Sequence, residues 1–519
     1  NNALSLTATN VNIKAGSFTT GASTAVKGAI DLSGTIDLNA AAGLTLKTDA
    51  TPVANGTLKL GPVITINGGN VVLTHSGLLT LLGDVIANGN ITETATTGSV
   101  VTTTPGVEIG NTTISGTVTL NSNPANGFIS LSRPVTLNQS LAIQASGNGN
   151  IAISTVDANS AALTKDLTIT ILGATGVVTL GGSLGAGGAL TKVQVNAGAS
   201  GSIGINGAVI TTMGASGQSF TALNTNYSTA LILTAGSGPI AFVGGLNSST
   251  NADLTLATIG ALSFGGAVGA GGALGDIDTT LASSGLTATT ISAKSFDTNV
   301  ALAGPISITG AQTYANNLKL ETSGTSNMAM TSVIATTGGI NLKTAQGTIS
   351  VGALTASDAT NGIIVLNHGG NLTLNGNIIA GESLTFTSGL NTLISVGTNT
   401  GGAILIDVDN SDVAFGTNVD LVQNLTIQNR NSKDVIFSGF LDSSNGTKNL
   451  SISTIGDVSF AKTVGQIAAS RLGDIAISNG ASSLTASADV NAKSMSSGVV
   501  AGAINFAGTQ NYAGASGLT

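Results

Sequence analysis

The chain has 519 residues, of which only 8% are charged and 3% are aromatic, and it contains 72 Gly but no Trp and no Cys. A large globular core takes much of its volume from aromatic side chains, so this composition favours one elongated body with a narrow core of small aliphatic residues. The net charge of −8, with only 16 Lys and Arg, excludes a basic surface for nucleic acid, and the apolar runs are far shorter than the roughly 20 residues of a transmembrane helix.

A unit of short apolar strand, Gly or Asn turn and short apolar strand repeats along the chain and is clearest over residues 67–94. There a turn at residues 67–70 precedes expected strands at residues 71–74, 78–82, 85–87 and 91–92. Each strand is too short to be stable alone. Hydrophobic residues make up 41% of the chain and alternate with polar ones as in strands, so a core can form and a disordered chain is excluded. The pattern predicts an all-β fold, one continuous right-handed parallel β-helix (β-solenoid) of roughly 20–25 coils over residues 1–519.

A longer repeat is superimposed on this pattern. Residues 176–190 recur with few changes at residues 260–274, and a diverged copy begins at Gly456. The copies define diverged repeats near residues 167–220, 254–320 and 450–519. Both ends of the chain read as ordinary repeat rather than as polar caps, so we expect a segment of a longer polypeptide, or a chain that stacks end to end with copies of itself.

Glycine clusters at residues 185–188 and 269–272 resemble part of a dinucleotide-binding loop. That loop needs another Gly three residues on and then a helix, but Leu190 and Leu274 stand there and further strands follow. We therefore expect these glycines to form tight corners with positive φ.

Asn followed by Leu begins five expected strands, at Asn317, Asn341, Asn371, Asn424 and Asn449. Their spacing is near one or two coils, so their amides are expected to stack into a hydrogen-bonded ladder at one corner. Three of them also read as Asn-x-Ser/Thr glycosylation sequons. The structural interpretation is favoured, because acceptor sites lie on surface loops and these residues lead directly into strands.

The strand pattern, together with Gly-Gly-Ala-Val-Gly at residues 265–269 and Gly-Ala-Gln-Thr-Tyr at residues 310–314, resembles the low-complexity repeats of very large bacterial surface proteins. These are proteins of the filamentous haemagglutinin and autotransporter-passenger type. The resemblance implies a right-handed parallel β-helix that is exported across the outer membrane. It also implies a role in adhesion, aggregation or surface coating.

Charged side chains concentrate in residues 407–474. Asp407 and Asp409 are expected on one face of a strand, and Asp412 follows in the turn. A solvated outer face is the simplest interpretation of the cluster. A weak Ca²⁺ or partner site formed by these three carboxylates, and a catalytic group of carboxylates, are the alternatives.

The sequence predicts no enzyme, no catalytic residue and no cofactor. His75 and His368 are the only imidazoles and lie far apart, and with no Cys they give neither a transition-metal site nor a Ser-His-Asp triad. Both are expected at strand or turn positions without a chemical task. Tyr314 and Tyr512 occupy equivalent repeat positions, which favours packing under a turn over sugar stacking. Thr residues form no regular row of the kind that ice binding requires.

Two function classes remain open at this point. In the first, the chain is the rod of an extracellular adhesin on the bacterial cell surface, and its partner is a host or neighbouring cell, matrix or glycan. In the second, it is a structural protein that polymerises through coil ends or rod sides into a filament or surface layer. Both use the same scaffold and neither needs a motif.

Overall fold

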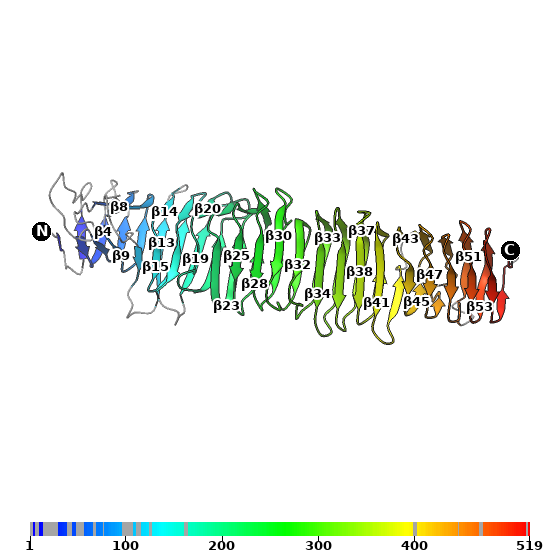
Figure 1. Cartoon of the computed structure of the whole chain (residues 1–519). Coiled ribbons are helices and arrows are strands. Elements are labelled where there is room, and N and C mark those ends of the chain that lie inside the picture. Colours follow the sequence, from blue (N-terminus) through cyan, green and yellow to red (C-terminus); the bar gives the residue numbers. More distant parts are fainter. Residues whose placement is uncertain are drawn as a thin grey trace. The chain divides into compact units, whose positions relative to one another are not determined.

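The computed structural model describes residues 4–5, 10–13, 30–38, 44–47, 57–65, 69–75, 77–95, 107–110, 116–123, 127–159, 165–397, 402–444, 446–466, 471–514 and 517–519. The chain divides into two compact units, residues 1–274 (the N-terminal unit) and residues 275–519 (the C-terminal unit). Within each unit, parallel strands stack coil upon coil (Figure 1). The described residues contain no helix, hence none that is long and apolar enough to cross a membrane.

The described residues form a β-solenoid of about 18 turns, which confirms the predicted fold class. Fewer turns form than the roughly 20–25 expected from a regular repeat, because the coils differ in length. Ile240 lies opposite Leu262 in the next coil, whereas Val85 lies opposite Leu120. The continuity of the solenoid over residues 1–519 stays a prediction.

The N-terminal unit has three sets of parallel strands. The first contains β1 (Leu4–Ser5), β3 (Ile30–Leu32), β6 (Leu58–Leu60), β9 (Leu79–Leu81), β12 (Val107–Ile109), β15 (Val135–Leu137) and β18 (Val156–Ala158). The second contains β5 (Leu44–Lys47), β8 (Val71–His75), β11 (Ile91–Ala95), β14 (Ile129–Leu131), β17 (Ile151–Ile153), β20 (Val177–Leu180), β22 (Ser202–Ile205), β24 (Asn224–Tyr227) and β27 (Gly245–Ser248). The third contains β2 (Asn10–Ile13), β4 (Thr35–Leu38), β7 (Val63–Thr65), β10 (Val85–Ala87), β13 (Thr117–Ser122), β16 (Ser140–Ala145), β19 (Asp166–Ile171), β21 (Leu190–Asn196), the second half of β23 (Val209–Thr221), β26 (Ile240–Phe242) and β29 (Leu262–Phe264). The first half of β23 pairs with β25 (Leu231–Thr234), which pairs with β28 (Leu254–Ala257).

The C-terminal unit stacks its strands in the same way. Its first part contains β30 (Leu274–Thr279), which begins at the boundary, and β31 (Leu286–Ala288), β32 (Ile291–Thr298), β33 (Ile306–Tyr314), β34 (Leu318–Thr322), β35 (Met328–Ala335), β36 (Ile340–Thr344), β37 (Ile349–Ala356), β38 (Ile363–His368), β39 (Leu372–Leu374), β40 (Ile378–Ala380) and β41 (Ser383–Ser388). They are followed by β42 (Leu393–Val396), β43 (Ile404–Val408), β45 (Asn418–Leu421), β46 (Leu425–Asn429), β48 (Leu441–Asp442), β49 (Leu450–Ser453), β51 (Leu472–Ser478), β53 (Val490–Ser497) and β55 (Gln510–Tyr512). A separate parallel sheet contains β44 (Val413–Phe415), β47 (Val435–Phe437), β50 (Val458–Phe460), β52 (Leu484–Ala486) and β54 (Ile504–Phe506).

Alternation of side chains explains why these segments form strands. In β8, Val71, Leu73 and His75 are buried while the two residues between them are half-buried. Inward positions stack in register from coil to coil, as do Leu131, Ile153 and Leu180. Burying one such side chain stabilises the fold by about 1.5–3 kcal/mol, and each coil needs its neighbours to do so. The expected strands within residues 71–94 are confirmed, while positions 67 and 68 of the expected turn lie outside the described residues.

The core is not purely aliphatic, because the few Phe residues are concentrated in it. In the N-terminal unit Phe220, Phe242 and Phe264 stack with ring centroids 4.9 and 5.8 Å apart. In the C-terminal unit Phe386, Phe415, Phe437 and Phe460 stack at 5.1, 4.8 and 5.3 Å. Parallel pairing in register places equivalent positions of successive coils above one another. A Phe at one inward position therefore stacks well on a Phe at the same position of the next coil.

The positive φ expected of the glycine clusters is confirmed at the first glycine of each cluster and was wrong for the others, Gly187, Gly188, Gly271 and Gly272. Gly185, Gly269 and Gly465 have φ of 69°, 75° and 65°, in the left-handed region that suits Gly. The residue before each, Leu184, Val268 or Val464, forms an isolated parallel bridge to a neighbouring coil. The three copies of the repeat therefore share one backbone corner.

The expected Asn corner exists, with a different hydrogen bond. Asn317, Asn371, Asn424 and Asn449 each accept, through Oδ1, a backbone N–H of the next coil, donated by Gly339 (2.8 Å), Leu393 (3.1 Å), Asn449 (2.9 Å) and Asp474 (2.8 Å) respectively. Asn341 instead lies within β36. The prediction that these amides stack on one another was therefore wrong, because the N–H groups leading into each strand need an acceptor first.

Candidate functional site

Asp407 and Asp409 share a cation from the next coil. Arg430, directly after β46, places Nη2 2.8 Å from Asp407 Oδ2 and Nη1 3.2 Å from Asp409 Oδ1. Asp407 lies in β43 and Asp409 just beyond its end, and we call these three residues the Arg430 cluster. Burial raises the pKa of Asp407, Arg430 lowers it and Asp409 raises it, and the net direction is upward. Asp407 Oδ1 is buried without a hydrogen-bond partner among the described residues.

Asp412 has a different task from the other two predicted ligands. Its Oδ1 accepts the N–H of Asp434 at 3.0 Å, and Asp434 Oδ1 accepts the N–H of Asp457 at 2.7 Å. These three residues precede β44, β47 and β50, so they occupy the corner position that Asn holds elsewhere, and we call them the Asp ladder. Several charges in residues 407–474 are thus explained by turn closure between coils.

The calcium alternative stays a prediction. Among the residues that the structure describes, no group of three or more Asp, Glu, His or Cys is arranged to hold a metal ion. A cation at Asp407 and Asp409 would have to displace the Arg430 guanidinium, which already offers both carboxylates charge-assisted hydrogen bonds.

A polar hollow of about 380 Å³ lies beside the Arg430 cluster. Its lining is rich in amides, and consists of Gln428, Asn429, Arg430, Asn431, Ser453, Ile455 and Asn479. Two internal hydrogen bonds hold it: Asn431 Nδ2 donates to Asn410 (2.8 Å) and Asn479 Nδ2 to Ser453 Oγ (2.6 Å). Arg430 is the one charged residue in this lining.

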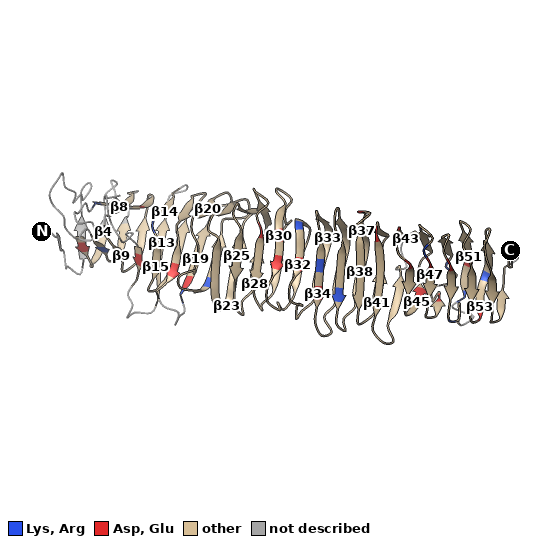
Figure 2. Cartoon of the chain, viewed as in Figure 1, with Lys and Arg blue, Asp and Glu red and all other residues tan. Residues whose placement is uncertain are grey.

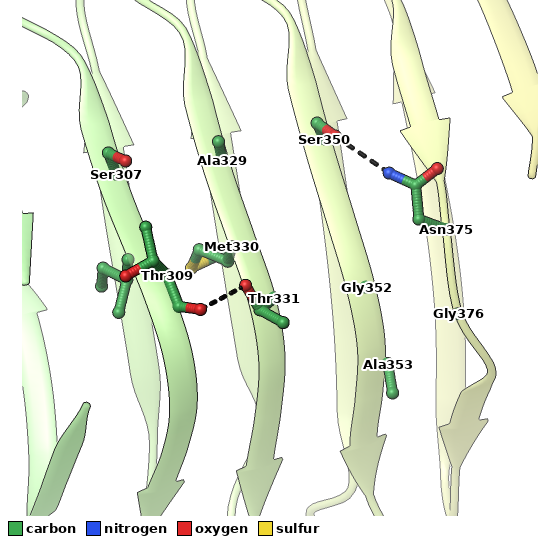
Figure 3. A pocket seen from close by; sticks show the side chains of 11 residues that line it. Ser307, Thr309, Ala329, Met330, Thr331, Ser350, Gly352, Ala353, Asn375 and Gly376 are labelled. Atoms are coloured by element: carbon green, nitrogen blue, oxygen red, sulfur yellow. Dashed lines mark hydrogen bonds between the residues drawn. The ribbon is translucent and has the colours of Figure 1, made fainter. Parts of the chain in front are cut away.

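A shallow groove of about 510 Å³ crosses four coils of the C-terminal unit, where β33, β35 and β37 bend (Figure 3). Hydroxyl, amide and small side chains line it, and no charged residue does. The register between β33 and β35 shifts after Ile308, and Thr331 Oγ1 donates to the Thr309 carbonyl at 2.8 Å across this bend. Asn375 Nδ2 donates to Ser350 Oγ at 3.1 Å on the other side. We call this surface the Thr309 groove.

Figure 2 marks the charged positions along the C-terminal unit, and several of these residues pair across neighbouring coils. Lys294 lies 2.7 Å from Asp276, and Lys343 lies 2.6 Å from Glu321. A matching pair forms in the third repeat, where Lys493 lies 3.5 Å from Asp474. Exposed pairs of this kind contribute at most about 1 kcal/mol and mainly favour one coil register.

The two histidines are buried and do have a structural task. Nδ1 of His75 lies 2.6 Å from the Gly77 carbonyl, and Nδ1 of His368 lies 2.7 Å from the Gly370 carbonyl. His75 also contacts Glu93, with 2.7 Å between Nε2 and Oε1. Both ring nitrogens of His75 are therefore engaged, and neither is available as a base for a Ser nucleophile.

Glu93 is the residue that the sequence interpretation missed. It is 1% exposed and takes an inward position of β11, in register with Leu73 and Leu131. The signal was present in Ile91-Thr92-Glu93, where alternation places an acid on the apolar face.

Tyr314 and Tyr512 pack as expected. Tyr314 is fully buried and its hydroxyl donates to Gln312 Oε1 at 3.0 Å, while the Tyr512 hydroxyl donates to Gln510 Oε1 at 2.8 Å. Burial raises the pKa of both phenols.

No protein-family model, curated protein or solved structure matches the chain. The described residues offer two open polar surfaces, the Thr309 groove and the hollow beside Arg430.

Proposed function

We propose that this chain is the non-catalytic β-solenoid of a bacterial surface or secreted adhesin of the filamentous haemagglutinin or autotransporter-passenger type. It would be extracellular and would attach the cell to a host or neighbouring surface, matrix or glycan. The observation that carries the proposal is the Thr309 groove, which presents hydroxyl and amide groups on four successive coils.

Stacked coils repeat such groups at about 4.8 Å, the spacing of strands in a sheet. A polymeric surface meets many equivalent weak contacts at once, and linked weak contacts add up to firm attachment. Ladders such as Phe415 on Phe437 fill the inside of the solenoid, so recognition falls to outward side chains.

Attachment of beads coated with the whole chain to cells, matrix and glycan surfaces tests this proposal. The double variant Thr309→Glu/Thr331→Glu places two charges in the groove and should reduce attachment severalfold. The matched control is Thr385→Glu/Thr387→Glu, at two exposed Thr of β41 on another face of the same unit. Equal attachment of both variants would show that the groove is not the recognition surface.

The alternative of a self-assembling filament or layer predicts another outcome. The chain would then form ordered polymers visible by electron microscopy, and coated beads would bind one another rather than a foreign surface. Turnover of a glycan that disappears in Asp407→Asn or Asp409→Asn would contradict the non-catalytic assignment.

A further inference from the structure

Glu93 of the N-terminal unit collects several polar contacts inside the core. Side chains of Glu93 and His75 are both 0% exposed. Glu93 Oε2 accepts the N–H of Ser132 (2.6 Å), the hydroxyl of Ser132 (3.1 Å) and the N–H of Arg133 (3.2 Å). With His75 on Oε1, one carboxyl group makes four polar contacts, three of which are donors to the same oxygen, and donors of this kind favour the charged form.

The positions of the protons follow from the partners. A carbonyl only accepts, so His75 Nδ1 must carry a proton to donate to Gly77. A second proton then lies between His75 Nε2 and Glu93 Oε1. Three donors on Oε2 and a lowered pKa make Glu93 the negative partner of a charge-assisted hydrogen bond inside an apolar core.

The pair closes two turns at once. β14 ends at Leu131, and the chain then turns away from β11, so the N–H groups of Ser132 and Arg133 have left the strand ladder. Glu93 supplies their acceptor, and His75 in turn closes the corner after β8. The side chains of one ion pair thereby hold β8, β11 and the segment after β14 together.

Other charges near the pair lie towards the outside. Lys47 at the end of β5 and Arg133 after β14 are half-buried, as is Glu108 on β12, and Asp84 before β10 is exposed. Among the described residues of these elements, His75 and Glu93 are the buried titratable groups.

We propose that His75 and Glu93 form an acid-sensitive lock, in which protonation of Glu93 releases the turn after β14 and loosens β8, β11 and β14 while the C-terminal unit stays folded. This inference does not depend on the proposed function. Loss of the negative charge removes the ion pair and weakens three hydrogen bonds at one carboxyl group, so the opening is local to these strands.

The direction of titration agrees with the geometry. Burial alone raises the pKa of Glu93, but the hydrogen bond and charge of His75, with the bonds from Ser132, outweigh burial and hold the pKa below its usual 4.5. A carboxyl group with a lowered folded pKa contributes stability that is complete above 4.5. That stability is lost as the pH falls through the folded value.

Hydrogen–deuterium exchange of the whole chain, corrected for intrinsic rates, tests the lock. From pH 7 to pH 3, protection of the Ser132 and Arg133 amides should fall severalfold, because the carboxylate that accepts their hydrogen bonds is lost. Amides of β35 in the C-terminal unit, a strand without titratable side chains, should keep their protection. Unchanged protection at Ser132, or an equal loss in both units, would overturn the proposal.

Two variants provide the comparison. Glu93→Gln keeps the shape but carries no charge, so protection at Ser132 should already be low at pH 7 and change little with pH. Glu108→Gln removes an outward Glu from the same unit and should keep the wild-type pH profile. A wild-type pH profile in Glu93→Gln would refute the lock, and if that variant does not fold, the profile of the wild-type chain still decides.

Discussion

His75 and His368 each end a strand, in different units, and they differ in the partner of their second ring nitrogen. Each takes the last inward position of its strand and contacts a glycine carbonyl two residues on. His75 has Glu93 beside it, whereas Nε2 of His368 is buried without a partner among the described residues. Burial lowers the pKa of His368 more than its bond to Gly370 raises it. The last inward position of the strand requires a hydrogen-bond donor that closes the turn. Whether an acid lies beside that donor depends on the residue in the neighbouring coil.

Neighbouring coils of the C-terminal unit support this conclusion. Thr344 lies in register with His368 and donates its hydroxyl to the Gly347 carbonyl at 2.7 Å. Thr322, one coil earlier, donates to the Ser326 carbonyl at 2.8 Å. A neutral hydroxyl and an imidazole therefore close the same corner. The C-terminal unit places its ionic contacts on the outside instead, as in the Arg430 cluster.

The largest expected effect tests the charged side of this comparison. Glu93→Leu leaves His75 and two turn amides without their acceptor in an apolar core, and should cost about 3–5 kcal/mol of unfolding free energy. Denaturant unfolding followed by circular dichroism measures it.

The double variant His75→Leu/Glu93→Leu should be more stable than Glu93→Leu, because neither half of the pair remains buried alone. A double variant as unstable as the sum of two singles would show that the pair is not coupled, and the contrast with His368 would lose its basis.

The second prediction concerns the uncharged histidine. The folded pKa of His368 lies below 6.5, so its contribution to stability is complete above 6.5 and is lost as the pH falls towards the folded value. His368→Thr copies Thr344 and should remove this loss. The melting temperature of the variant should therefore decrease less than that of the wild type between pH 7.5 and pH 5. Identical pH profiles would mean that His368 is not held neutral.

The sequence was sufficient for the architecture because that depends on period-two alternation and turn residues. The strands around Val71 and the corners at Gly185 and Gly269 follow from local rules of this kind. Which side chains contact one another depends on the number of residues in each coil. That number varies because the loops between the strands differ in length. His75 and Glu93 are brought together only because β8 and β11 pair directly, and the sequence does not state this register.

The candidate site was less predictable for the same reason. Asp407, Asp409 and Asp412 lie close in sequence, yet the structure assigns the first two to Arg430 and the third to the backbone of Asp434. Proximity along the chain suggested a common cation. The fold instead gives Asp407 and Asp409 one shared partner and Asp412 another, both one coil further on.

The third prediction separates hydrogen bonding from charge in the Asp ladder. Asp434→Ala removes the acceptor for the Asp457 N–H and should cost about 1 kcal/mol. Asp434→Asn keeps an acceptor and removes the middle of three stacked carboxylates, so it should be neutral or slightly stabilising at low salt. Equal destabilisation by both variants, measured by denaturant unfolding, would show that the charge itself matters here, as it does at Glu93.

The smallest expected effect is at the Arg430 cluster. Arg430 is 57% exposed, so Arg430→Met should cost no more than about 1 kcal/mol at pH 7. Without the guanidinium the pKa of Asp407 should rise further, and a raised carboxyl pKa favours the folded state below it. The cost of the substitution should therefore shrink as the pH falls and Asp407 becomes neutral. Thermal unfolding at pH 7 and pH 4 measures this difference.

Calcium distinguishes the two interpretations of the same carboxylates. Millimolar Ca²⁺ should raise the melting temperature of Arg430→Met, in which Asp407 and Asp409 are free to accept a cation, and leave the wild-type chain unchanged. A wild-type chain that Ca²⁺ stabilises as strongly as the variant would show that the cation displaces Arg430, and Asp407 and Asp409 would then be metal ligands after all. In that case the outward carboxylates would bind one particular cation, just as the buried Glu93 binds His75.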